Sequence, residues 1–235
     1  MCLVIKRKIP VLIATVLILS LAAAESVWGI RQIWNGIQKE ETVIVIDAGH
    51  GGVDPGAISK DGNVLEKTLN LAIAKCLQGY LQEAGYSVVM TRREDQDLAG
   101  NTTGRRKIAD MTERIRIMEE SKGDLMISIH QNSYPEEQYH GPQVFFQNHS
   151  EKAAAVALMV QLEMNSFTAP ENNRQAKAGS DYYILKNAPM TAILVECGFV
   201  SNPNEAALLM NEEYQKKIAW GIYSGVEKYL QSEGL

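Results

Sequence analysis

The chain has 235 residues, of which 46% are hydrophobic and 22% are charged, so it can form one large globular domain with a substantial core. Its formal net charge is −5 and no stripe of basic residues runs along it, which argues against a nucleic-acid partner. Its three cysteines are too few and too scattered to indicate a disulfide framework.

The N-terminal residues have the pattern of an export segment. A basic cluster at 6–8 precedes the uncharged residues 9–24, which end in three alanines. This order is typical of a secretory signal peptide. An uncleaved membrane anchor fits the same residues, although the apolar span is short for a membrane helix, and a buried core helix is a less favoured alternative. We therefore predict three parts: a signal peptide or membrane anchor at 1–24, a linker at 25–41, and an exported domain at 42–235.

Apolar runs and helical stripes alternate along the rest of the chain. Short β-branched or aromatic runs predict strands, and apolar residues at helical spacing between turn residues predict helices. Such alternation is typical of a three-layer α/β fold, with a mostly parallel central sheet and helices on both faces. The predicted strands are 43–46, 86–91, 124–130, 142–147, 181–186 and 192–196. The predicted helices are 64–84, one from Ile108 to Gly123, 151–165, 204–210 and 212–231.

Three of the predicted strands end in, or just before, a side chain that can bind a metal or move a proton. The run 43–46 leads through Asp47 into a glycine-rich turn with His50, the run 124–130 ends in His130, and the run 192–196 ends in Glu196. If these strands are parallel, the three groups share one edge of the sheet, where ligands of open α/β sheets bind. The alternatives are ordinary polarity at strand ends, or a Gly-Gly turn that binds an anion. An unpaired carboxylate is costly to bury, so Glu196 favours a functional site.

Glu66 has two explanations. It stands three residues after Asn63, which is the position of a capping-box glutamate at a helix start. A carboxylate in the first turn of that helix could equally point back to the edge that carries His50. A catalytic zinc ion takes three protein ligands and leaves a place for water. Two imidazoles from His50 and His130 and the carboxylate of Glu66 would supply them, and Glu196 would remain as the free acid–base group.

The arrangement of motifs resembles the zinc-dependent N-acetylmuramoyl-L-alanine amidases of the type 3 class. The resemblance spans about 42–231 and rests on five stretches. They are IDAGHGGVDPGA at 46–57, LEKTLNLA around Glu66, MTRRED at 90–95, ERIRIMEESKGDLMISIHQN around Arg114, and ILVECGFVSNPNEAALL at 193–209.

This resemblance implies that the domain at 42–235 is a catalytic domain. It implies one Zn²⁺ ion held by His50, Glu66 and His130, with Glu196 as the catalytic residue. The implied substrate is peptidoglycan, both stem peptide and glycan, cut between N-acetylmuramic acid and L-alanine. The residues alone also leave two alternatives open: a zinc exopeptidase on a similar sheet, and a wall-binding domain without catalysis.

Within the family, the chain is most similar to the germination-specific spore-cortex amidases of the CwlD group. The similarity rests on a single catalytic domain behind an apolar segment, without wall-binding repeats, and on a long loop at 95–107. It implies a role in sporulation and germination. The enzyme would be secreted or anchored, in the cell wall or the forespore intermembrane space. We also expect a regulatory protein partner, because the chain has no wall-targeting repeat of its own.

Overall fold

The computed structural model describes residues 42–102 and 104–234. The predicted signal peptide or anchor at 1–24 and the linker at 25–41 therefore lie outside the described residues. None of the helices in the described part of the chain has the length and apolar character that a bilayer span requires.

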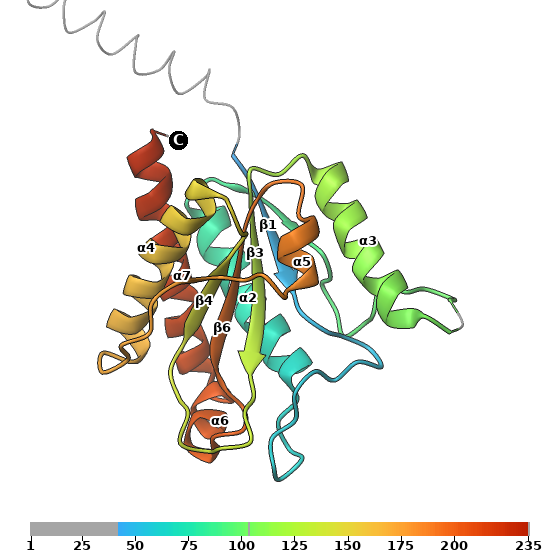
Figure 1. Ribbon diagram of the computed structural model, residues 1–235, viewed down its shortest axis with the longest axis vertical. Helices are drawn as coiled ribbons and strands as arrows, with labels where there is room; N and C mark the ends of the chain where they lie inside the picture. Colours follow the sequence, from blue (N-terminus) through green and yellow to red (C-terminus); the bar gives the residue numbers. More distant parts are fainter. Residues whose placement is uncertain (1–41, 103, 235) are drawn as a thin grey trace, which may run out of the picture. The chain divides into compact units, whose positions relative to one another are not determined.

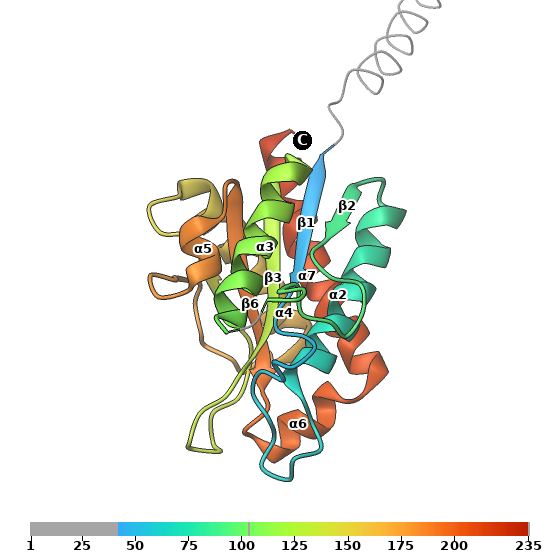
Figure 2. The ribbon, with the colours of Figure 1, turned by 90° about the vertical axis from the view of Figure 1, so that its right-hand side faces the viewer.

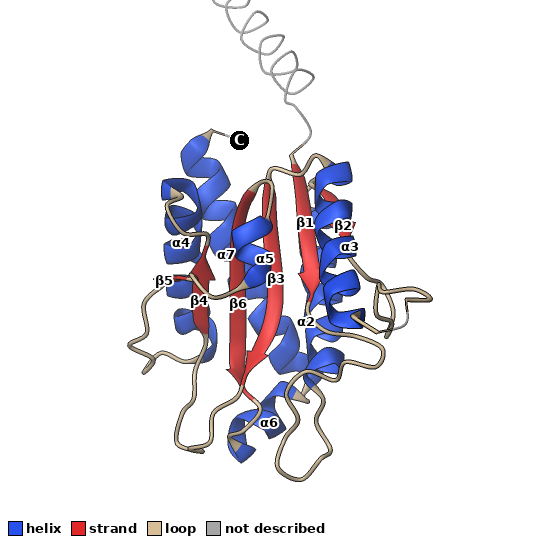
Figure 3. Cartoon of the chain, turned by 45° about the vertical axis from the view of Figure 1, so that its right-hand side comes forward, coloured by secondary structure: helices blue, strands red, loops and turns tan. Residues whose placement is uncertain are grey.

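The described residues form a central sheet with the strand order β2-β1-β3-β6-β4-β5 (Figures 1 and 3). β1 is parallel to both β2 and β3, and β3 is parallel to β6, whereas β4 is antiparallel to β6. The prediction of a mostly parallel sheet is therefore confirmed. The strands are β1 (Val43–Ala48), β2 (Ser87–Met90), β3 (Leu125–Asn132), β4 (Gln143–Phe146), β5 (Lys177–Ala178) and β6 (Thr191–Phe199).

Helices cover both faces of this sheet, as Figure 2 shows, so the predicted three-layer α/β architecture is confirmed. One face packs against α2 (Glu66–Glu83), α4 (Glu151–Thr168) and α7 (Glu212–Glu233). The other packs against α3 (Arg106–Ser121) and α5 (Tyr183–Asn187), while α6 (Pro203–Leu209) lies between β6 and α7 in the chain.

Alternation along the central strands divides the apolar side chains between two cores. Ile44 and Ile46 of β1 belong to the larger core under α2, α4 and α7, whereas Val45 between them belongs to the smaller core under α3 and α5. Both faces of the strand are buried, which explains why the run reads as continuously apolar rather than alternating with polar residues.

The predicted strand at 181–186 is wrong, because these residues lead into the short helix α5. Ile184 and Leu185 are consecutive and are both buried in the smaller core. Consecutive side chains of a strand point to opposite faces, whereas a helical turn can bury both on one side. The place beside β4 is taken instead by β5, which pairs Lys177 with Phe145.

The predicted cap at Asn63 is also wrong. Helix α2 begins at Glu66 with Leu65 as its N-cap, and no side chain caps it. The amide of Asn63 donates instead to Asp61, at 2.8 Å, within the preceding turn. Glu66 is thus the first residue of the helix, and its carboxylate is not engaged in a capping box.

Two helical glycines differ sharply in their surroundings and generate a matched prediction. A Cβ at Gly225 of α7 would lie 2.4 Å from Val160 Cα of α4, whereas a Cβ at Gly79 of α2 meets nothing within 4 Å. Gly225→Ala should destabilise the fold by about 1–3 kcal/mol, because backbone cannot yield without separating the helices. Gly79→Ala should stabilise it by about 0.5–1 kcal/mol, because alanine loses less entropy in a helix. Denaturant unfolding of both variants tests this, and effects of equal sign would contradict it.

Candidate active site

The site is built on a buried ion pair at the end of β1. Oδ1 of Asp47 accepts hydrogen bonds from Arg114 of α3 at 2.7 Å and from Thr91 at 2.8 Å, and Oδ2 accepts one from Ser128 of β3 at 2.7 Å. Burial alone would raise the pKa of Asp47, but the Arg114 guanidinium and these hydrogen bonds outweigh it and lower the pKa to about 2. The carboxylate is therefore ionised and ties β1 to α3 and β3.

Two buried arginines hold the backbone of the turn that follows. Arg92 donates to the carbonyls of Ala48 (2.8 Å) and Gly49 (3.0 Å), and Arg114 donates to those of Ala48 (2.9 Å) and His50 (2.7 Å). His50 has a φ of +61°, a left-handed conformation that is uncommon outside glycine. Strained backbone of this kind persists only where its surroundings enforce it, and the two guanidinium groups do so here.

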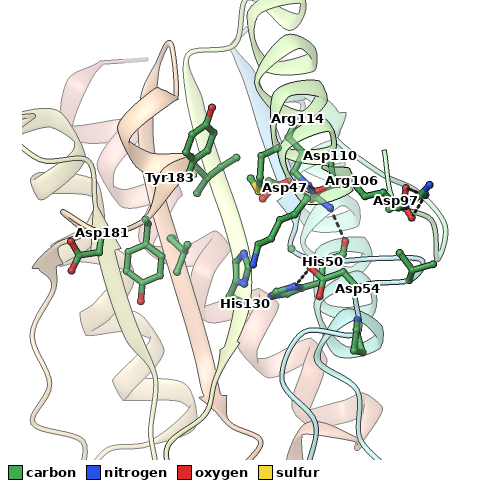
Figure 4. A pocket seen from close by; sticks show the side chains of 18 residues that line it. Asp47, His50, Asp54, Asp97, Arg106, Asp110, Arg114, His130, Asp181 and Tyr183 are labelled. Carbon is green, nitrogen blue, oxygen red and sulfur yellow. Dashed lines mark hydrogen bonds and ion pairs between the residues drawn. The ribbon is translucent and has the colours of Figure 1, made fainter. Parts of the chain in front are cut away.

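The structure brings the three predicted ligands together. Glu66 Oε1 lies 2.9 Å from His130 Nδ1 and 3.3 Å from His50 Nε2, and one ligand atom from each of the three residues lies within 4.8 Å of the others. Figure 4 shows the two imidazole rings side by side, His130 from β3 and His50 from the turn after β1. Gly49 permits this approach, because a Cβ there would lie 2.3 Å from the His130 ring.

The contacts of Glu66 decide against the capping explanation. Its Oε2 accepts from the Ala57 N–H at 2.7 Å, and Oε1 accepts from the Gln131 N–H at 3.0 Å as well as facing both histidines. Burial opposes ionisation, but the hydrogen bonds and charges of His130 and His50 lower the pKa of Glu66 well below its ordinary range. A helix N-terminus also favours a carboxylate. Glu66 is therefore an anion directed at the two imidazoles.

Asp54 belongs to the site and was missed in the sequence. Its Oδ2 lies 2.8 Å from His50 Nδ1, and its Oδ1 accepts from the Gly56 N–H at 3.1 Å. The carboxylate orients the ring so that Nε2 faces Glu66. Burial lowers the pKa of His50, but Glu66 and Asp54 together outweigh burial and raise it. The available signal was an aspartate four residues after a histidine, across a turn that Gly51 and Asp54 close with two backbone hydrogen bonds.

Glu196 lies beside His130 on the neighbouring strand. The two residues are register partners of β6 and β3, and both strands continue beyond them, so neither residue ends its strand as predicted. The Glu196 side chain is buried: Oε1 accepts from the Tyr182 hydroxyl at 3.3 Å, and Oε2 has no hydrogen-bond partner among the described residues. Burial raises the pKa of Glu196 to about 7. Tyr182 was missed because its segment was assigned to a strand.

The donor set fits a zinc ion. Zinc binds imidazole nitrogen and carboxylate oxygen, and three such ligands leave a position for water and substrate. The second ring nitrogen of a ligating histidine almost always donates a hydrogen bond to a carboxylate or carbonyl, and Asp54 offers such an acceptor to His50. The other two histidines, His140 and His149, are exposed.

A cavity of about 600 Å³ opens beside the two histidines on the face covered by α3 and α5 (Figure 4). Its walls combine charged and apolar groups from both helices and from the turn after β1, including Lys107, Met111 and Tyr182. When the reacting atom of a substrate lies beside the imidazole rings, the neighbouring part of that substrate can therefore occupy this partly enclosed cavity.

Comparison with known proteins assigns the chain to a family. Residues 44–228 match the family of N-acetylmuramoyl-L-alanine amidases. The chain belongs to this family. Of the three functions that the residues alone left open, the amidase is the one that the match supports. Its substrate, peptidoglycan, lies outside the cytoplasmic membrane, so this amidase acts extracytoplasmically.

Individual relatives agree with the family assignment. The germination-specific N-acetylmuramoyl-L-alanine amidase of Bacillus subtilis is 38% identical over 195 residues, which cover 82% of this chain and 81% of that protein. The CwlD amidase of Clostridioides difficile, solved in complex with the GerS lipoprotein, is 37% identical with a TM-score of 0.79, covering 82% of this chain and all of that one. An N-acetylmuramoyl-L-alanine amidase from Clostridium difficile 630 is 31% identical with a TM-score of 0.72, covering 83% and 99%.

Asp54 should control metal affinity in this amidase. Asp54→Asn removes the negative charge that supports His50, and loss of such a partner typically weakens metal binding about 10- to 100-fold. Competition with a chelator of known affinity measures the change in the purified exported domain. Asp61→Asn is the matched control, because Asp61 is an exposed carboxylate on the same loop whose side-chain hydrogen bonds, among the residues that the structure describes, go to Ser59 and Asn63. Equal metal affinity in both variants would remove Asp54 from the site.

Proposed function

We propose that this N-acetylmuramoyl-L-alanine amidase is zinc-dependent, with one Zn²⁺ held by His50, Glu66 and His130 and with Glu196 as general base and then general acid. The proposal rests on the arrangement of side chains at the carboxyl end of the central strands. Three ligand atoms converge within 4.8 Å, and the adjacent strand carries a buried carboxylate, one oxygen of which has no hydrogen-bond partner within 42–102 and 104–234. A buried carboxylate oxygen without a partner is costly, so its retention needs a role outside the fold.

The reaction follows from these positions. A zinc ion held by His50, Glu66 and His130 would polarise the amide carbonyl and lower the pKa of a water molecule. Oε2 of Glu196 is placed to accept a proton from the attacking water as the water oxygen bonds to the carbonyl carbon. Glu196 then returns the proton to the L-alanine nitrogen as the C–N bond breaks, leaving a lactyl carboxylate and a free amine. With a pKa raised to about 7 by burial, the same group can both accept and donate.

Digestion of purified peptidoglycan tests this assignment. The wild-type enzyme should release new N-terminal L-alanine, and a chelator should abolish release until zinc is restored. Glu196→Gln should keep stoichiometric metal and the unfolding midpoint but lose nearly all turnover, because an amide of the same size cannot accept the proton. Full activity in that variant, or chelator-resistant activity in the wild type, would overturn the proposal.

The pH dependence should report Glu196. A general base must be ionised, so kcat/KM should fall as the pH drops through its pKa. This acid limb of the pH profile should have its midpoint below pH 7 when the site holds its cation, since a nearby positive charge favours the ionised form of Glu196. The Tyr182 hydroxyl bond lowers the pKa of Glu196, so Tyr182→Phe should move this acid limb to higher pH. Tyr183→Phe, one residue on and exposed, is the control. A limb that stays in place or moves to lower pH in Tyr182→Phe would contradict the role of Glu196.

We further propose that the enzyme acts in the spore cortex during sporulation or germination, after export through residues 1–24. The support is the 38% identity to the germination-specific enzyme of Bacillus subtilis. A regulatory protein partner is proposed on the same footing, because the CwlD amidase at 37% identity has been solved in complex with the GerS lipoprotein. Whether the segment 1–24 is cleaved or anchors the enzyme, and whether 25–41 is a linker, remain predictions.

A further inference from the structure

Three aromatic side chains form a cluster at the carboxyl ends of β3 and β6 and in the loop after β3. The rings of Tyr134 and Tyr139 meet edge to face with centroids 4.9 Å apart, and Tyr139 stacks on Phe199 at 6.3 Å and 28°. Phe199 is buried and Arg174 lies over its ring, whereas Tyr134 is 52% exposed and Tyr139 is 38% exposed. We call Tyr134, Tyr139 and Phe199 the aromatic platform.

Hydrogen bonds hold the platform in place. The Asn202 amide donates to the carbonyls of Glu137 (2.8 Å) and Tyr139 (3.3 Å), and the Tyr134 N–H donates to the Ser201 hydroxyl at 2.9 Å. These bonds fix the loop between β3 and β4 against the turn after β6. The rings of Tyr134 and Tyr139 thus stay partly exposed to solvent, while these hydrogen bonds fix the shape of the loop that carries them. Exposed aromatic rings that lie together on a fixed backbone are typical of a binding surface.

The platform is continuous with the active site along two strands. Tyr134 comes four residues after His130 and Phe199 three residues after Glu196, and Asn132 pairs with Phe199 across the two strands. At about 3.3 Å per residue, Tyr134 and Phe199 each lie on the order of 10–13 Å along the chain from the site residue of the same segment. Figure 1 shows the loop between β3 and β4 extending past the carboxyl end of the sheet. Neither tyrosine lines the cavity under α3 and α5.

We propose that the aromatic platform binds a sugar ring of the glycan chain, next to the muramic acid whose amide is cut; this rests on the proposed function. The C–H face of a pyranose packs on an aromatic ring, and its hydroxyl and acetamido groups can bond to the phenol hydroxyls at the platform's edge. The scissile amide hangs from one sugar, so neighbouring sugars must pass close to the metal ligands. The cavity then serves the other product, the stem peptide.

The surroundings of the platform favour a sugar over a second copy of the chain. Exposed charged or polar side chains border the two tyrosines, including Glu136, Glu137 and His140, and Lys60 of the loop after β1 pairs with Glu137. Charged residues are depleted from the cores of protein interfaces. A sugar, which offers an apolar face ringed by hydroxyl groups, matches rings surrounded by polar groups.

The test compares two substrates in Tyr134→Ala, Tyr139→Ala and the double variant. One substrate is polymeric peptidoglycan, and the other is a soluble N-acetylmuramoyl peptide without neighbouring sugars. The ratio of kcat/KM for the polymer to kcat/KM for the short substrate should fall about three- to tenfold per tyrosine, through KM. Tyr139→Phe should restore the ratio. Phe167→Ala, which removes an exposed aromatic side chain of α4 outside the platform, should leave the ratio unchanged.

Binding without turnover separates this proposal from the enzyme mechanism. Peptide-free glycan oligomers, titrated by calorimetry into the metal-depleted Glu196→Gln chain, should bind, and the double tyrosine variant on that background should not. Glycan binding that survives the double variant would overturn the proposal, as would an equal loss on both substrates. Binding of the free stem peptide that is lost in the double variant would assign the platform to the peptide instead.

Discussion

The contact on which the rest of this molecule depends is the buried pair of Asp47 and Arg114. It links the end of the central strand β1 to helix α3, and Ser128 and Thr91 bring β3 and the segment after β2 to the same carboxylate. An ion pair out of water is tolerated only when further hydrogen bonds satisfy both partners. The surplus donors of Arg114 are satisfied by the carbonyls of Ala48 and His50. The hydrogen bonds that satisfy this buried guanidinium therefore also shape the turn that carries His50, a proposed metal ligand.

Glu66 has a comparable double role on the other side of the turn. It is the first residue of helix α2, and its carboxylate accepts hydrogen bonds from the backbone N–H groups of Ala57 and Gln131 and faces both imidazoles. This one carboxylate therefore joins the loop after β1 and the backbone of β3 to the start of α2, and it places a negative charge beside two histidines. Glu196 is the reverse case, because its burial leaves one oxygen without a partner in the described part of the chain and raises its pKa to about 7. The site contains two carboxylates whose surroundings push their pKa values apart, which is how acid–base and ligand roles are separated.

The site residues that could be predicted from the sequence are polar residues that depart from the apolar pattern of a buried strand. His50, His130 and Glu196 follow or interrupt apolar runs, where polar groups are costly, so their positions could be recognised without a structure. Asp54 could not, because its contact with His50 depends on a turn with a left-handed histidine. Tyr182 could not, because Tyr183, Ile184 and Leu185 have strand-forming side chains and only packing against the smaller core shows that they are helical.

The sequence predicts the central strands, which are buried on both faces, better than it predicts the strands toward the edge of the sheet. The continuous apolar runs of β1, β3 and β6 predict parallel central strands. The short run of β4 says nothing about direction, and β4 is in fact antiparallel to β6. Neither the two-residue β5 nor the start of α2 at Glu66 has a pattern of its own, because tertiary contacts determine both.

The direction of β1 has a consequence for how the molecule can be attached to something else. The first described residues enter the sheet at the amino end of β1, and Figure 1 shows the C-terminal end of α7 at that same end of the molecule. The histidines lie past the opposite end of the strand. An attachment made at either end of the described domain, before Thr42 or after Gly234, therefore lies at the opposite end of the sheet from the histidines and leaves them open to a polymer too large to diffuse to the enzyme.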